Sequence, residues 1–255
     1  LGVYMCGAVF EVDPDWPGRY FNTAFIISDE GKVILKYRKI NCGNVGGIIN
    51  DTTPGDVYTE YVKKYGMEAL FPVVDTPYGK LGCLICFDIN FPENARCVAL
   101  NGAEVILYPT GEPHGAHRDA WECARRTRAY ENNVYLCMAN HGSVSNTGMP
   151  NFRSHGWSEI VNYEGRVLAV ADGQGEAIIS ARLDLNASRY HRSQPGLNFL
   201  PQVRTQLYGP IYASKEACPN DHWLENPMQD RREGPALMKQ VIEKFYEKGI
   251  FVPYE

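Results

Sequence analysis

The sequence lacks three features that would each point to a particular class of protein. No apolar run approaches the roughly 20 residues that a membrane-spanning helix needs, so we expect no membrane partner. Lys and Arg form no long basic run in a chain with a formal net charge of -5, which argues against nucleic acid as a partner. Residues 43–47 read "GNVGG", but no Lys-Ser or Lys-Thr pair follows, so we predict no phosphate-binding loop.

Paired, regularly spaced cysteines are also missing. The eight cysteines are scattered along the 255 residues, and most of them lie in apolar segments typical of strands or helices. This distribution predicts free thiols in a reducing compartment rather than a disulfide framework, so we expect a cytoplasmic protein. Hydrophobic residues make up 44% of the chain, which is enough for a sizeable buried core.

The first half of the chain predicts strands that are joined by tight turns. It opens with "LGVYMCGAVFEVD", which is typical of the middle of a buried strand, and we therefore expect a fragment of a longer protein. Residues 23–39 predict a hairpin that turns at residues 29–31. Residues 69–88 predict a second hairpin that turns near residues 78–80.

The second half alternates helices with strands. The pattern predicts helices over residues 92–100, 118–132 and 235–249. It predicts strands over residues 103–109, 134–140 and 176–185, and a pair of strands over residues 157–170 with a turn at Glu164-Gly165. Such an alternation predicts an α/β protein with mixed sheets. Periodicity fades from about His191 to Asp230. We therefore expect one domain over residues 1–190 and a C-terminal extension over residues 191–255, which packs on this domain or on a partner subunit.

The stretch "LGCLICFD" at residues 81–88 is apolar on both faces, which is typical of a strand buried between two layers. We expect the strand to end just after Cys86, with Asn90 as N-cap and Pro92 in the first turn of the next helix. A thiol at such a junction lies near exposed backbone N–H groups, which favour a thiolate and can hold an oxyanion. The alternative is that Cys86 is a small buried hydrophobic side chain, as we expect for Cys83.

Lys39 continues the apolar face of the strand that precedes it, together with Val33, Leu35 and Tyr37. A lysine that faces the core needs a carboxylate partner or a function. The alternative is a lysine at the end of a strand, with a buried stem and an ammonium group that reaches solvent. Spacing alone leaves both interpretations open.

Two histidine patterns offer further alternatives. Glu112, His114 and His117 combine an acid with a His-x-x-His pair, a set of side chains that is able to bind a metal. These residues are expected in a loop without defined ligand geometry, so we predict no metal site. A Cys/His dyad with His141 is the second alternative, but the surrounding signature of papain-type proteases is missing.

Several motifs together resemble the carbon–nitrogen hydrolase (nitrilase) superfamily. They are "YRK" at 37–39, "PGD" at 54–56, "GCLICFDINFPENAR" at 82–96, "NGAEVILYPTG" at 101–111, "RRTRAYENNVYLCMAN" at 125–140 and "SHGWSEIVNYEGRVLA" at 154–169. The resemblance extends from Leu1 to about Arg189. In the C-terminal extension, "YGPIYA" and "ACPN" are similar to the aliphatic amidase and formamidase branch.

This resemblance implies a four-layer α-β-β-α sandwich whose N-terminal strand and helix units are missing from the chain. It also implies hydrolysis of a non-peptide carbon–nitrogen bond, in an amide or an N-carbamoyl group, through a cysteine thioester that releases ammonia or an amine. The alternatives are a nitrilase that converts a nitrile to an acid and ammonia, and a degenerate or fragmentary homologue with a structural or binding role. We expect a homo-oligomer that acts on a small molecule and uses no metal or organic cofactor.

On matching positions, the resemblance implies Cys86 as the nucleophile and Lys39 as the cation that stabilises the thiolate and the tetrahedral intermediate. The backbone N–H of Phe87 is expected to be a second donor to the oxyanion. The residues expected to shape the substrate pocket are Thr110, Gly111 and Glu112. Those expected in supporting or ion-pairing roles are Glu93, Arg96, Glu131 and Asn132.

The chain departs from the family pattern at the general base. The family's base is a glutamate on an earlier strand, which we expect upstream of Leu1 in a longer protein. Many members carry a second glutamate after the lysine, but no Glu lies between Lys39 and Glu60 here. Asp51 is the only nearby acid before Pro54, and its standing in for this glutamate is an alternative that we do not favour.

Overall fold

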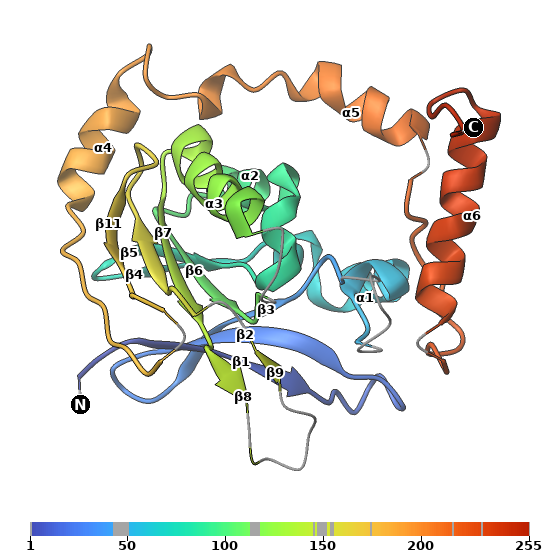
Figure 1. Cartoon of the computed structure of the whole chain (residues 1–255), viewed down its shortest axis with the longest axis horizontal. Helices are drawn as coiled ribbons and strands as arrows, with labels where there is room; N and C mark the ends of the chain where they lie inside the picture. Colours follow the sequence, from blue (N-terminus) through green and yellow to red (C-terminus); the bar gives the residue numbers. More distant parts are fainter. Residues whose placement is uncertain are drawn as a thin grey trace.

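The computed structural model describes residues 2–42, 51–112, 118–144, 146, 152–153, 156–173, 175–215, 217–230 and 232–254. They form two stacked sheets, a helical layer on the second sheet, and a C-terminal set of helices at the periphery (Figure 1). The predicted α/β fold with mixed sheets is confirmed.

The first sheet contains three antiparallel strands in the order β1-β2-β3. They are β1 (Met5–Glu11), β2 (Phe21–Ile27) and β3 (Val33–Arg38). The hairpin predicted over residues 23–39 is the β2-β3 pair, with Gly31 in its turn at a φ of +80°, a conformation that glycine adopts without strain. Because β3 ends at Arg38, Lys39 is the first residue of the loop that follows.

The second sheet contains six strands in the order β11-β10-β7-β6-β5-β4. They are β4 (Val73–Thr76), β5 (Gly79–Cys83), β6 (Val105–Thr110), β7 (Tyr135–Asn140), β10 (Glu159–Val161) and β11 (Val167–Val170). The central strands β5, β6 and β7 are parallel, and the outer pairs are antiparallel hairpins or neighbours. The carboxyl ends of β5, β6 and β7 therefore meet at one edge of the sheet.

Helices α2 (Pro92–Leu100) and α3 (Arg118–Asn132) lie on one face of the second sheet (Figure 1). Each helix connects two of the parallel strands, as right-handed crossovers usually do. The helix predicted over residues 118–132 has these bounds in the structure. The two sheets and this helical layer account for three layers of the expected four-layer sandwich.

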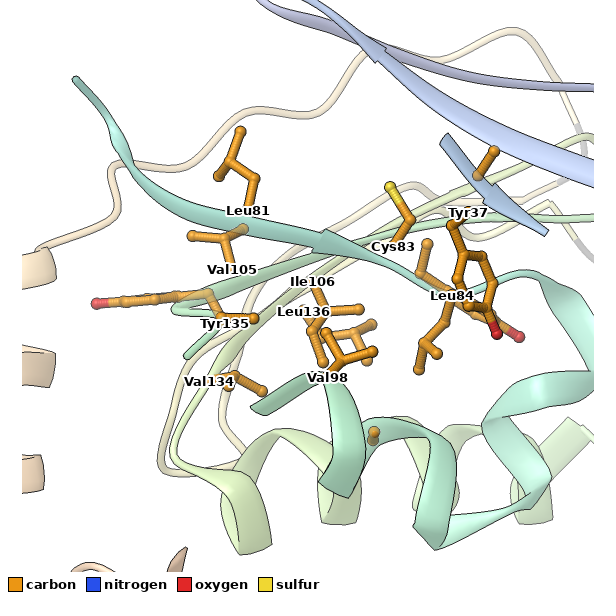
Figure 2. Close-up of a cluster of buried hydrophobic side chains, with 14 of the residues drawn as sticks. Tyr37, Leu81, Cys83, Leu84, Val98, Val105, Ile106, Val134, Tyr135 and Leu136 are labelled. Carbon is orange, nitrogen blue, oxygen red and sulfur yellow. The ribbon is translucent and has the colours of Figure 1, made fainter. Parts of the chain in front are cut away.

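The main core lies between the two sheets and beneath the helical layer. Tyr37 of the first sheet belongs to the same buried cluster as Leu81 and Cys83 of β5. Figure 2 shows Leu81 and Cys83 pointing to one side of β5, while Val98 of α2 packs against the other side. Cys83 has no exposed surface, so the prediction that its thiol is packing material is confirmed.

Strand β1 is more exposed than the sequence predicts. Its Met5, Val9 and Phe10 side chains are about half exposed, at 50–56% of their surface. The prediction of a buried strand is therefore wrong. The physical reason is that β1 is an edge strand that pairs only with β2, so side chains on both of its faces stay partly exposed.

The strand predicted over residues 176–185 is also wrong. Residues 176–184 lie outside both sheets, and Ile178 is fully exposed. A segment with alternating apolar and polar residues forms a strand only where an adjacent strand offers hydrogen-bond partners to its backbone.

Three helices run around the periphery, and the first of them begins before the C-terminal extension (Figure 1). They are α4 (Leu185–Ser193), α5 (Thr205–Lys215) and α6 (Glu233–Glu247). Of these helices the sequence predicts only α6. Helix α5 is not predicted because it contains Gly209 and Pro210, two residues that disfavour helices. That this extension packs on a partner subunit stays a prediction. None of the described helices combines the length and the apolar character that crossing a bilayer requires.

The remaining elements are short. Helix α1 (Tyr58–Tyr65) and four 3₁₀ helices (Pro54–Val57, Met67–Leu70, Cys86–Asn90 and Leu200–Gln202) lie in connections, and β8 (Ser143–Val144) pairs with β9 (Phe152–Arg153).

Candidate active site

The predicted site residues gather where the parallel strands of the second sheet end. Cys86 follows β5 by three residues, Thr110 is the last residue of β6, and Asn140 is the last residue of β7. Ligands of open α/β sheets commonly bind at the carboxyl ends of the strands. The sheet therefore brings together the segments that the sequence analysis assigns to the nucleophile and to the pocket.

Cys86 has an unusual backbone conformation. It begins the 3₁₀ helix Cys86–Asn90 and has a φ of +47°, a left-handed conformation that costs a non-glycine residue about 1–3 kcal/mol. Its side chain is half-buried. Such strain is common where a side chain is held for a function. The strained backbone also distinguishes Cys86 from Cys83, because Cys83 lies in the regular strand β5.

The turn after Cys86 supplies free backbone donors. In the 3₁₀ helix, the N–H of Asp88 donates to the carbonyl of Ile85 at 3.0 Å. The N–H of Phe87 precedes this first bond, and the first N–H groups of a helix have no partner inside it. The structure is thus compatible with the predicted oxyanion donor, whose role stays a prediction.

The predicted start of helix α2 is corrected by one residue. Phe91, not Asn90, is the N-cap, and Pro92 is the first helical residue as expected. Asn90 belongs instead to the 3₁₀ helix, where its Nδ2 donates to the carbonyl of Phe87 at 3.1 Å. A separate turn that carries Cys86 therefore lies between β5 and α2.

Lys39 is buried, with 7% of its surface exposed, so the interpretation of an inward-facing lysine is confirmed. Burial disfavours the charged form, but the surrounding acidic groups outweigh it and raise the pKa of Lys39 above its usual value. These groups are Cys42, Cys86, Asp51 and Asp88. Lys39 is accordingly an ammonium group whose charge acts on Cys86.

Asp88 connects Lys39 with the turn of Cys86. The carboxylate has no exposed surface, and it accepts hydrogen bonds from Tyr37 Oη at 2.7 Å, the Asn41 N–H at 2.9 Å and the Ile85 N–H at 3.1 Å. The first two donors belong to β3 and its loop, and the third precedes Cys86. One buried carboxylate thus fixes the lysine loop against the nucleophile turn. The sequence analysis missed this role, although an acid at the end of an apolar strand was its signal.

The titration of Asp88 gives a pH prediction. Burial raises its pKa from 3.8 to about 6, against the opposing effect of its hydrogen bonds. The pKa is higher in the folded protein, so the stability from protonated Asp88 is complete below about pH 4 and lost as the pH rises through about 6. The difference corresponds to about 3 kcal/mol. We expect Asp88→Asn to cost more unfolding free energy at pH 4 than at pH 7, by about this amount.

Urea unfolding of the unsubstituted protein and of Asp88→Asn at both pH values measures the difference. The asparagine variant does not titrate at this position, so the comparison cancels the contributions of all other carboxyl groups. An equal cost of the substitution at pH 4 and pH 7 would contradict the prediction.

The predicted pocket residues lie at the end of β6. Thr110 is 9% exposed, and its Oγ1 is buried without a hydrogen-bond partner among the described residues. Gly111 leaves room for His141, because a Cβ there would lie 2.4 Å from the histidine Nε2. The backbone N–H of Glu112 donates to Asn140 Oδ1 at 3.1 Å. Thr110 therefore offers an unused hydroxyl next to a tightly packed corner.

Glu112 is part of a buried ion-pair network. Arg125 Nη1 lies 2.7 Å from Glu112 Oε2, and Arg125 Nε lies 2.9 Å from Glu159 Oε1. All three side chains are at most 5% exposed. The sequence analysis missed Arg125 and Glu159, although the polar residues within the apolar side of the helix at 118–132 indicated such a contact.

The four residues expected in supporting roles contact one another's helices, their own helix or the C-terminal extension. Arg96 Nη1 of α2 donates to the carbonyl of Glu131 in α3 at 2.8 Å. Asn132 Nδ2 donates to the carbonyl of Arg128 at 2.9 Å, one turn earlier. Glu93 contacts the C-terminal extension, since Tyr212 Oη donates to its Oε1 at 2.8 Å. Their expected support of the site stays a prediction.

The other candidate residues are only partly described. His114 and His117 lie outside the described residues, and no group of three His, Cys, Asp or Glu side chains in the described part is arranged to hold a metal ion. Asp51 is buried, and the Cys42 thiol donates to its backbone carbonyl at 3.9 Å. Asp51 therefore lies in the same buried cluster as Lys39.

Two stacked sheets with a helical layer on the second form an α/β sandwich, and solved structures share this fold. The crystal structure of Saccharomyces cerevisiae Nit3, a member of branch 10 of the nitrilase superfamily, matches with a TM-score of 0.58 and 28% identity over 73% of this chain and 61% of that one. A carbon–nitrogen hydrolase from Helicobacter pylori G27 matches with a TM-score of 0.65 and 26% identity over 82% of this chain and 70% of that one.

The family model of carbon–nitrogen hydrolases matches residues 1–192, so the chain belongs to this family. Nitrilase homolog 2 of Dictyostelium discoideum is 32% identical over 79% of this chain and 58% of its own length. The omega-amidase NIT2 of Homo sapiens is 30% identical over 81% of this chain and 70% of its own length. The chain thus spans between about half and three quarters of these relatives.

Proposed function

We propose that this chain carries the nucleophile-bearing part of an amidase that hydrolyses a non-peptide carbon–nitrogen bond in an amide or N-carbamoyl group. The observation that carries the proposal is the pairing of Cys86, held at a φ of +47°, with the buried ammonium of Lys39. The omega-amidases among the relatives support an amide as the substrate class.

In the proposed reaction, the Cys86 thiolate attacks the carbonyl carbon of the substrate. The positive charge of Lys39 stabilises both the thiolate and the oxyanion, and the N–H of Phe87 donates a second hydrogen bond. Collapse of the tetrahedral intermediate breaks the carbon–nitrogen bond and releases ammonia or an amine, which takes up a proton. Water then hydrolyses the thioester and restores the thiol.

A proton acceptor for the Cys86 thiol is needed in this reaction. Both oxygens of Asp88 already accept hydrogen bonds from Tyr37 and from backbone N–H groups. Asp51 is the other acid whose charge acts on Lys39. The acceptor that the family resemblance implies is a glutamate on an earlier strand, and Asp51 is the alternative to it among the described residues.

Thr110 is the proposed contact for the polar part of the substrate. Its buried hydroxyl has no hydrogen-bond partner among the described residues, and leaving such a group unpaired costs about 1–3 kcal/mol. A substrate carbonyl or amide that binds at the end of β6 would satisfy it.

The experiment that tests the function offers matched short aliphatic amides, N-carbamoyl compounds and nitriles, and measures ammonia release. We expect ammonia from amides or N-carbamoyl compounds and none from the matched nitriles. Ammonia from nitriles alone would replace the amidase with a nitrilase. Ammonia from no compound, together with ordinary alkylation kinetics at Cys86, would indicate a homologue with a structural or binding role.

A further inference from the structure

Three cysteines besides Cys86 gather between the two sheets. Cys83 of β5 and Cys137 of β7 are both paired with Leu107 of β6, so they lie in one row across the second sheet. Side chains in such a row point to the same face. Cys6 of β1 contacts this face, with its Sγ 4.0 Å from Cys83 Sγ. The thiols of Cys6 and Cys83 therefore meet across the space between the sheets.

Cys6 is the member of this pair that a small oxidant can reach. Its side chain is half-buried, whereas Cys83 has no exposed surface. The hydrogen bond from Cys83 lowers the pKa of Cys6, against the opposing effect of burial. The same contact and burial raise the pKa of Cys83 well above its usual value. Cys6 is therefore the first of the two to become a thiolate, the form that attacks an oxidant.

We propose that Cys6 and Cys83 are a peroxide-sensitive pair, whose disulfide joins the two sheets and displaces the turn that carries Cys86. The Cys6 thiolate attacks one oxygen of hydrogen peroxide, the O–O bond breaks, and a sulfenic acid and hydroxide form. The Cys83 thiol then attacks the Cys6 sulfur. The S–O bond breaks, an S–S bond forms, and the leaving hydroxide takes the Cys83 proton as water. The thiols are thus oxidised to a disulfide, and the peroxide is reduced to water.

The contact geometry allows this bond after a small movement. A disulfide holds its sulfur atoms about 2 Å apart, so the 4.0 Å contact must shorten by about 2 Å. Disulfides between two packed sheets occur in the immunoglobulin fold. Cys83 is the last residue of β5 and lies just before the turn of Cys86. A shift of β5 toward β1 therefore moves this turn relative to Lys39.

The first test requires no amidase activity, so its outcome is independent of the proposed function. Cys86→Ala is treated with hydrogen peroxide, digested with trypsin without reduction and analysed by mass spectrometry. The peptide that ends at Arg19 should be joined to residues 81–96, in which Cys83 is then the single cysteine. Dithiothreitol should separate the two peptides. Absence of this linked peptide would overturn the proposal.

Cys6→Ser and Cys137→Ala, each combined with Cys86→Ala, are the matched controls. Cys6→Ser should abolish the linked peptide. Cys137→Ala should leave it unchanged, because burial raises the pKa of Cys137 to about 12 and keeps it a thiol at neutral pH. A peroxide-induced link between Cys6 and Cys137 in place of Cys83 would overturn the assignment of the pair.

The second test measures the consequence for Cys86, which bears on the proposed function, in the unsubstituted protein. Iodoacetamide is added after peroxide, and fragmentation of residues 81–96 compares the alkylation of Cys86 in linked and unlinked molecules. Alkylation should be slower on the order of 10-fold in linked molecules, because a shift of about 1 Å moves the thiolate from its place beside Lys39. Equal rates would overturn the displacement of the turn, whether or not the protein hydrolyses amides.

Discussion

Cys86→Ala is expected to lower the rate of amide hydrolysis by at least about 1,000-fold, because the thioester cannot form without its sulfur atom. The substitution should leave the fold intact. Cys86 is half-buried and lies outside a regular strand. Replacement by alanine therefore removes few packing contacts and breaks no backbone hydrogen bond. Ammonia release from a short amide in the two proteins measures the effect.

Cys83→Ala is the matched control, since it removes a thiol only three residues earlier. Cys83 is fully buried in the core and lies 4.0 Å, sulfur to sulfur, from Cys6. Its replacement should lower stability, by about 1 kcal/mol for the lost buried volume, and retain hydrolysis. The proposed mechanism fails if Cys86→Ala keeps activity, or if Cys83→Ala loses it while the protein is folded.

Lys39→Met is expected to lower kcat on the order of 100-fold to 1,000-fold, the range for removing one group that stabilises an oxyanion. Methionine matches the length of the buried stem and removes only the charge. The loss should exceed that from most surface lysines because water does not screen a charge at a site that is 7% exposed. Initial rates of ammonia release at saturating amide measure kcat directly.

Lys36→Met tests whether a lysine three residues earlier, in β3, has this effect. Lys36 is exposed and pairs with Glu11 at the surface, where an ion pair contributes little, so its replacement should leave kcat unchanged within about twofold. Alkylation of Cys86 by iodoacetamide should slow in Lys39→Met and not in Lys36→Met. Equal kcat values in the two variants would show that Lys39 has only a structural role.

The strands that carry the site were predictable because their patterns are local. Apolar residues on both faces of the segment at 81–88 predicted a strand between two layers, and the turn residues at 29–31 predicted the hairpin before Lys39. The predicted end of the first strand after Cys86 was wrong, because β5 ends at Cys83. The two central positions, Cys86 and Lys39, followed from the ends of these strands and from the family resemblance. The structure places both at the same end of the two-sheet core.

The connections within the site were not predictable, because they join residues far apart in the sequence. Tyr37 and Asp88 are 51 residues apart, and Arg125 and Glu159 are 34 residues apart. Each pair forms only when two layers stack, and no periodicity or spacing encodes the partner of a buried polar group. The sequence indicated that some polar side chains would be buried. The fold decides which of these side chains form contacts with one another.

The edges of the fold were the other source of error. The sequence of β1 does not reveal whether another part of the protein covers the strand. The Phe10 side chain is about half exposed because β1 lies at the edge of its sheet. Helix α5 formed despite Pro210, whose missing N–H affects only one hydrogen bond in a short exposed helix. Tertiary context therefore decided the exposure of β1.

The most direct test of the account is the mass of the protein quenched with acid during turnover of a short aliphatic amide. The account predicts a thioester: an added acyl mass on the peptide that contains Cys86, absent from Cys86→Ala and released as free acid on standing at neutral pH. Ammonia release without any acyl mass on Cys86, or with the acyl group on another residue, would contradict the central role of this thiol.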